Sequence, residues 1–192
     1  MNRRKAIFRI AVAGAAFLGV AAGYKWLSIR RTPNLGLLRE SIPLLSALAE
    51  TIIPETDTPG AASTGVGEFI LIMVRDCASR AEQNNFLDGL RDLQAYSLLN
   101  HGQKYENCSV PEQESILKHF EAAGNRLNEG IIGKIKSRYL GRPFFRILKS
   151  YTVEGYFTSE AGATRALAYS YIPGSFHGCT DMKPGQKAWA TR

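Results

Sequence analysis

Two carboxylates on one short turn are the side chains best placed to do chemistry together. Glu55 and Asp57 lie two positions apart within the sequence IIPETDTPGA, residues 52–61. Paired carboxyl groups can serve as a general acid and a general base. Asp and Thr beside Pro and Gly also hydrogen-bond their own backbone and so fix turns. The Pro- and Gly-rich context favours this structural role, so we expect no catalytic residue on the turn.

The histidines and cysteines offer no metal or haem site by their spacing. His101, His119 and His177 are isolated from one another, and we interpret each as a surface or capping residue rather than a ligand. The three cysteines are too far apart for a zinc or iron–sulfur centre. The Cys-x-x-Cys-His motif of covalently attached haem is also absent. We therefore expect no catalytic residue, no metal ligand and no cofactor on this chain.

Motifs for nucleotide binding and for hydrolysis are missing as well. The sequence Gly-Val-Gly at residues 65–67 lacks the third glycine of a dinucleotide fingerprint and does not follow a predicted strand. The sequence contains neither a P-loop nor the Gly-x-Ser-x-Gly of α/β-hydrolases. These patterns argue against a dinucleotide-binding fold and against an α/β-hydrolase.

The net charge of +7 is concentrated at the start of the chain. Residues 1–31 hold seven of the 24 basic residues and no acid, so the other 17 basic residues balance the 17 acidic ones. Nucleic-acid binding would require clustered positive charge on the folded body. We therefore expect no nucleic-acid partner.

Residues 1–31 have the layout of an export signal, with a basic start and a short apolar run. The pair Arg3 and Arg4 resembles a twin-arginine signal, although Ala6 stands where Phe is often found. An ordinary secretory signal or a short amphipathic tail is the alternative. We expect export to the periplasm by the twin-arginine route.

Whether this leader is cleaved is left open by the sequence. Residues 21–23, Ala-Ala-Gly, offer small side chains but no Ala-x-Ala site. If it is kept, the run from Ile10 to Leu27 is about the minimum that spans a bilayer. The basic residues before the run would then hold the N-terminus in the cytoplasm and the body outside. A retained anchor of this kind would keep the protein associated with the inner membrane.

An oxidising compartment would allow the cysteines to form a disulfide. We expect Cys77 to pair with Cys108, which closes a loop of about 30 residues and contributes roughly 3–4 kcal/mol in the chain-entropy treatment. Cys179 is then left over in a Gly-Cys turn. The alternative is three buried thiols.

Apolar residues recur at helical spacing throughout the body, residues 32–192. The first helix should begin near Glu40 and stop at Pro54. A later one should begin at Ser109, which can act as the cap while Glu112 returns the hydrogen bond. Alternating β-branched runs and fixed-period repeats are absent from the sequence. We predict an all-α fold, an irregular single-domain helical bundle behind an apolar signal or anchor segment.

The expected helical faces are Leu44, Leu45, Leu48 and Ile52; Phe69, Ile70, Met73, Val74 and Cys77; Phe86, Leu90, Leu93 and Leu98; Ile116, Leu117 and Phe120; Ile131, Ile132 and Ile135; Phe144, Phe145, Leu148, Tyr151 and Val153; and a last helix from Ser159 through Leu167 and Tyr169.

Two blocks of sequence resemble the gluconate 2-dehydrogenase subunit 3 family. The first is the helix that ends in IIP, then TDTPGA, then the Gly-Val and Phe-Ile pairs within residues 65–70. The second is GYFTSEAG at residues 155–162, followed by PGSFHGC at residues 173–179. The resemblance extends from about Leu44 to Trp189, with a weak middle part.

The resemblance implies a non-catalytic small subunit beside a large FAD-dependent dehydrogenase of the glucose–methanol–choline type. FAD would be bound by that partner. Haem c would be present only where a multihaem cytochrome c forms a third subunit. In such complexes the small subunit alone carries the twin-arginine leader, so Arg3 and Arg4 would export the folded partner as well.

We expect the partner to bind at the turn of the first block and at the second block, because turns present backbone groups and aromatic surface. Tyr169 and Tyr171 add to the aromatic residues there, and the alternative is that the aromatic side chains close the protein's own core. The predicted interface residues are Pro54, Asp57, Pro59, Gly60, Tyr156, Phe157, Ser159, Glu160, Pro173 and Phe176.

Two other hypotheses stay open. The first is an enzyme in its own right, with Glu55, Asp57 or a histidine as the catalytic group. The second is a membrane-anchored helical scaffold or binding protein of the cell envelope that is unrelated to a dehydrogenase.

Overall fold

The computed structural model describes residues 31–126 and 140–169, residue 23, and parts of the C-terminal tail: 174, 179, 181–182 and 184–190. Within these residues the regular structure is helical, and the sole β-pairing is a parallel bridge between Ala168 and Trp189. The predicted all-α class is confirmed. None of the helices in the described part is both long and apolar enough to cross a membrane.

The elements follow one another along the chain as short and long helices. In order they are α2 (Gly36–Glu40), α3 (Ile42–Ile52), α4 (Val66–Ile72), the π-helical turn η1 (Met73–Cys77), α5 (Arg80–His101), the 3-10 turn η2 (Tyr105–Asn107), α6 (Val110–Arg126), α8 (Phe144–Thr158) and the π-helical turn η3 (Gly162–Ala166).

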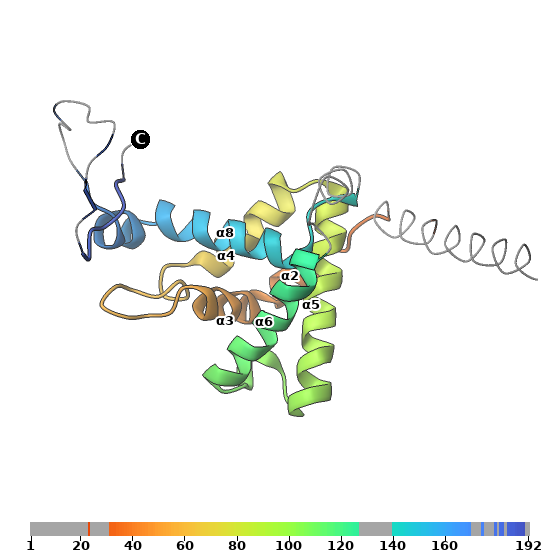
Figure 1. The fold of residues 1–192 in the computed structure, drawn as a ribbon. Helices are drawn as coiled ribbons and strands as arrows, with labels where there is room; N and C mark the ends of the chain where they lie inside the picture. The colour runs from red at the N-terminus through yellow and green to blue at the C-terminus, as the bar shows by residue number, and fades with distance from the viewer. Residues whose placement is uncertain are drawn as a thin grey trace, which may run out of the picture.

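Helix α8 is the centre of the bundle, and it contacts α3, α4, α5 and α6. Figure 1 shows it running across the molecule, with α5 crossing at its start and η3 at its far end. An isolated amphipathic helix buries one stripe, whereas α8 buries residues on several sides because helices surround it. Its buried residues are Phe144, Ile147, Leu148, Tyr151, Thr152, Gly155 and Tyr156.

Local signals set the helix ends largely as predicted. Helix α3 stops at Ile52, two residues before Pro54. At the start of α6, the Ser109 backbone N–H donates to a Glu112 carboxylate oxygen at 2.8 Å, which confirms the return bond predicted for Glu112. The Ser109 hydroxyl also donates to this carboxylate, at 2.7 Å. The sequence analysis did not identify the capping box of Ser79 and Glu82 that begins α5.

Some predicted faces differ from the structure. Leu98 and Val153 are exposed rather than buried, because each lies on the side of its helix turned away from its neighbours. The predicted last helix is a single π-helical turn that ends at Ala166, and Leu167 is already extended. The predicted helix that contains Ile131, Ile132 and Ile135 lies outside the described residues.

The predicted Cys77–Cys108 disulfide is wrong, since both cysteines are free. The Cys108 thiol lies 3.2 Å from the Ser97 hydroxyl, near the end of α5, whereas Cys77 precedes its start. The stretch of α5 from Arg80 to Ser97 is about 25 Å long, and a disulfide requires Cα atoms within about 7 Å. The alternative of three buried thiols is wrong as well, because Cys77 and Cys179 are exposed.

The last residue of the predicted leader is bound to the body. The Arg31 carbonyl accepts a hydrogen bond from the Asn84 side chain at 2.8 Å. The Arg31 guanidinium forms an ion pair with Asp88. Both partners belong to α5. Arg3 and Arg4 lie outside the described residues, so the export signal stays a prediction.

Thr152 is a buried polar residue in the middle of α8. Its side chain is fully buried, and its hydroxyl has no hydrogen-bond partner in the part of the chain that the structure describes. A buried polar group without a partner costs about 1–3 kcal/mol. Thr152→Val keeps the shape and removes the hydroxyl, so we expect the free energy of unfolding to rise by about 1 kcal/mol. Urea denaturation followed by circular dichroism measures this.

The matched control is Thr158→Val at the exposed end of the same helix, where the hydroxyl donates to the Glu154 carbonyl at 2.7 Å. We expect this variant to change stability by at most about 0.5 kcal/mol. A loss of stability in Thr152→Val would show that its hydroxyl is satisfied in solution.

Candidate functional site

The loop between α3 and α4, residues 53–65, is held in shape by one carboxylate. Glu50 in the last turn of α3 accepts the backbone N–H of Glu55 at 2.8 Å and that of Ala62 at 2.9 Å. The loop backbone packs so closely on this side chain that a Cβ atom on Gly60 would lie 2.2 Å from Glu50 Oε1. A side chain at position 60 would therefore push the Glu50 carboxylate away from the loop.

Within the loop, the residues of the predicted turn bond to one another. The Thr56 hydroxyl donates to the Asp57 carboxylate at 3.0 Å, and the Thr56 backbone N–H donates to the Thr58 carbonyl at 3.0 Å. Glu55 and Asp57 are exposed. The turn is closed by the backbone bond between Thr56 and Thr58, while the Asp57 carboxylate contacts the Thr56 hydroxyl; the bonding of Asp57 to its own backbone stays a prediction.

The loop is joined to the end of α8 by Tyr156. Its hydroxyl donates to the Pro59 carbonyl at 2.8 Å, across 97 positions of sequence. The Tyr156 side chain is only 2% exposed, so the ring packs in the core while its hydroxyl reaches the loop. The two segments that the sequence analysis selected are thus brought side by side.

A tight turn connects α8 to η3. The Ser159 hydroxyl donates to the Tyr156 carbonyl at 2.6 Å and accepts the Gly162 backbone N–H at 3.1 Å. A Cβ atom on Gly162 would lie 1.9 Å from the Tyr156 carbonyl oxygen, which is backbone and cannot move aside. Position 162 therefore requires glycine.

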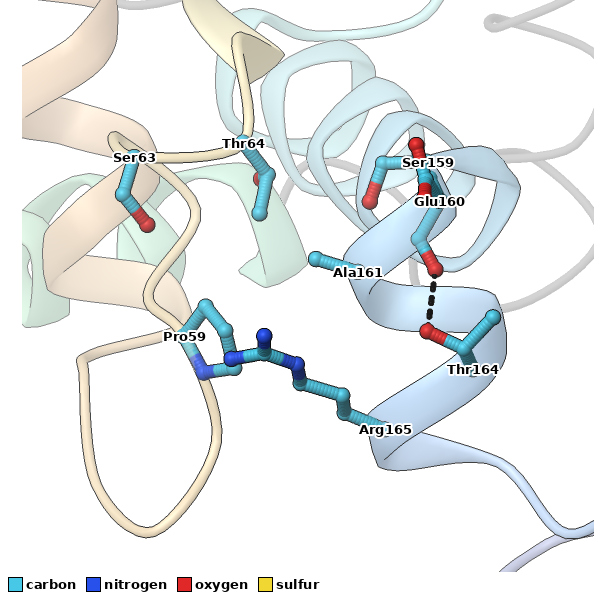
Figure 2. Close-up of a pocket in the computed structure, with 8 residues that line it drawn as sticks. All are labelled: Pro59, Ser63, Thr64, Ser159, Glu160, Ala161, Thr164 and Arg165. Atoms are coloured by element: carbon cyan, nitrogen blue, oxygen red, sulfur yellow. Dashed lines mark hydrogen bonds between the residues drawn. The ribbon is translucent and has the colours of Figure 1, made fainter.

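A groove of about 490 Å³ lies between the loop and η3. Figure 2 shows the loop on one side and the α8–η3 turn on the other, with the Arg165 side chain extending across toward Pro59. Ser63 and Thr64 donate their hydroxyl hydrogens to loop carbonyls at 2.9 and 3.0 Å. The lining residues are Pro59, Ser63, Thr64, Ser159, Glu160, Ala161, Thr164 and Arg165.

The C-terminal tail returns to this end of the molecule. The Ala168 N–H donates to the Ala188 carbonyl at 2.8 Å, and the Ala190 N–H donates to the Ala168 carbonyl at 2.7 Å. Lys187 also donates its ammonium to the Arg165 carbonyl. Trp189 is thereby paired with Ala168, two residues after the end of η3.

The match to known families covers both walls of this groove. The family model described as gluconate 2-dehydrogenase subunit 3 matches residues 39–174.

The chain belongs to the gluconate 2-dehydrogenase subunit 3 family.

The match includes the loop, α8 and η3, and it ends before the tail segment that contains Trp189. No curated protein and no solved structure matches the chain with comparable significance.

The structure divides the interface residues predicted from the family resemblance into three groups. Tyr156 and Gly60 are buried, so they position the surface rather than contact a partner directly. Two further residues, Pro173 and Phe176, lie outside the described residues, as does Tyr171. Those that remain at the surface are Pro54, Asp57, Pro59, Phe157, Ser159 and Glu160, of which Pro59 and Ser159 are half-buried.

Three residues of this end were missed by the sequence analysis. Glu50 orders the loop, Arg165 lines the groove, and Trp189 pairs with Ala168. Glu50 could have been found from the sequence, because it is the one acid in the last turn before the Ile-Ile-Pro helix end. A polar loop needs acceptors for its backbone N–H groups, and such an acid can supply them. Arg165 and Trp189 carried no local signal.

The histidines within the described residues belong to another part of the fold. His101 Nδ1 lies 3.3 Å from a Glu112 carboxylate oxygen, and the His119 ring stacks on Tyr96 with centroids 4.5 Å apart. These contacts join α5 to α6, away from the groove. His177 lies outside the described residues.

The turn at Gly162 generates a stability prediction. Gly162→Ala forces a methyl group against the Tyr156 carbonyl, so α8 or η3 must shift. Overpacking of this kind costs about 1–3 kcal/mol, and we expect a corresponding loss in the free energy of unfolding, measured by urea denaturation. The control is Gly36→Ala, where a Cβ meets only the Asn34 side chain at 3.4 Å. Equal stabilities of the two variants would contradict the prediction.

Proposed function

We propose that this chain is the non-catalytic small subunit of a periplasmic, FAD-dependent sugar, sugar-acid or polyol dehydrogenase. The large partner is a flavoprotein of the glucose–methanol–choline type, and it binds the FAD. A multihaem cytochrome c that carries haem c is the third subunit where the complex has one.

The observation that carries this proposal is the joining of the two family segments by Tyr156 and Pro59. Both lie within the family match, and their hydrogen bond makes one surface from segments far apart in sequence. Glu50 and the Gly162 turn hold the two walls of that surface. A surface already ordered before binding loses little conformational entropy when a partner docks. This favours a docking role for the groove end of the molecule.

The second part of the proposed role is to escort the partner during export. Arg3 and Arg4 supply a twin-arginine signal for a partner that folds around its flavin before export. The small subunit would then stabilise the flavoprotein in the periplasm, either free or held at the inner membrane by an uncut leader.

Native purification from detergent-treated membranes of the host tests the proposal. We expect a flavin absorption band and one large co-purifying chain, identified by mass as the flavoprotein. A haem band would add the cytochrome subunit. A colourless single chain would contradict the proposal and favour the envelope scaffold. Sugar-dependent dye reduction by the isolated chain would instead favour an enzyme in its own right.

Export of the partner gives a separate prediction. Replacing Arg3 and Arg4 by lysine keeps the charge but removes the arginine pair, so we expect both this chain and its flavoprotein to stay in the cytoplasm. Cell fractionation with flavin fluorescence as the readout measures this. Lys5→Arg is the matched control, because it alters the basic start while keeping the pair, and it should leave export intact. Normal export of the flavoprotein with the double variant would overturn the escort role.

A further inference from the structure

We infer that Arg165 and Trp189 anchor the partner, with the groove taking an extended, carboxylate-bearing segment of that partner. This inference rests on the proposed function, because the partner is the large flavoprotein. It adds the chemistry by which that protein is recognised.

Arg165 presents a cation that is unpaired within the described part of the chain. Among the residues that the structure describes, its guanidinium has no hydrogen bond or ion pair, and Glu160 in the same groove does not pair with it. Arg142, by contrast, binds Glu82 at 2.5 Å. Since a guanidinium matches a carboxylate with two parallel hydrogen bonds, an Asp or Glu side chain is the fitting ligand.

The hydroxyl groups of the groove favour an extended backbone. Ser63, Thr64 and Thr164 each donate their hydrogen to a carbonyl of their own segment. Their oxygens can therefore only accept further hydrogen bonds. An extended segment carries backbone N–H groups at regular intervals, and those are the donors that such oxygens require. The groove thus has acceptors for a backbone and one cation for an acidic side chain.

Trp189 supplies an aromatic anchor on the tail, paired with Ala168 three residues beyond Arg165. The bridge to Ala168 fixes its backbone, and Lys187 ties the tail to the carbonyl of Arg165. In an extended chain successive side chains point to opposite sides. The side chain of Trp189 therefore points to the side opposite those of Ala188 and Ala190. It is 57% exposed, and the adjoining Tyr169 is 67% exposed.

Residue type and position agree in this arrangement. Trp, Tyr and Arg are the side chains that most often dominate protein–protein binding energy. Here Arg165 lines the groove beside the loop, and Trp189 lies on the tail that pairs with Ala168, next to Tyr169 in sequence. The backbone of each anchor is tied down, so little ordering of the main chain remains to be done on binding.

The experiment uses the full-length chain co-expressed with the large flavoprotein of the same host, and measures the dissociation constant of the purified pair by biolayer interferometry. We expect Arg165→Glu to weaken binding at least about 30-fold, and Trp189→Ala at least about 10-fold. Arg165→Lys should keep part of the affinity, since it preserves the charge but loses the bidentate geometry.

The matched controls are Arg146→Glu, the same charge reversal at an exposed position near the start of α8, and Met182→Ala, which truncates another exposed apolar side chain of the tail. Both should bind as wild type. Circular dichroism of each variant confirms that the fold is kept. An Asp→Arg or Glu→Arg change in the flavoprotein that restores binding to Arg165→Glu would identify the paired carboxylate.

The outcomes distinguish a failure of the proposed function from a failure of the anchor inference. If wild-type chain does not bind the flavoprotein, the proposed function fails. If wild type binds and Arg165→Glu binds equally well, the proposed function stands and the anchor inference is overturned. Equal weakening by Arg165→Glu and Arg146→Glu would also overturn it, since that result reports a general effect of charge.

Discussion

The groove end of the molecule depends on the Glu50 carboxylate. A loop without regular structure must find partners for its backbone N–H groups, and Glu50 accepts one from each side of the loop. The same contact favours glycine at position 60, because a side chain there would displace the carboxylate from the loop. With the loop fixed in this way, the Pro59 carbonyl is presented to Tyr156. One acid in the last turn of a helix thus determines how two distant segments meet.

The fold could be predicted where short-range interactions decide it. Pro54 ends a helix because of its own ring, and Ser109 with Glu112 begins one through contacts three residues apart. The error in the predicted disulfide could not be seen from the sequence, because whether Cys77 and Cys108 can meet depends on the length of α5 between them. Sequence spacing measures the loop that a disulfide closes, not the distance that a rigid helix imposes.

The candidate site was predicted at the level of segments, not of side chains. Tyr156 shows why: its ring is buried in the core and its hydroxyl bonds to the loop, so it fits both of the roles that the sequence left open for the aromatic residues. Arg165 and Trp189 were missed since their proximity arises from the tail pairing with Ala168. Such a contact between distant residues leaves no pattern in either segment alone.

The attachment of Arg31 to α5 fixes the end of the predicted leader at one end of the bundle. Arg31 binds Asn84 and Asp88, and the same part of α5 holds the start of α8 through Asn85 and the Leu140 carbonyl. The groove lies at the other end of α8, whose 15 residues span about 22 Å. Whatever holds the N-terminus and whatever occupies the groove are therefore kept apart by a rigid rod (Figure 1). Removing the residues ahead of Arg31 would leave that rod and its far end unchanged.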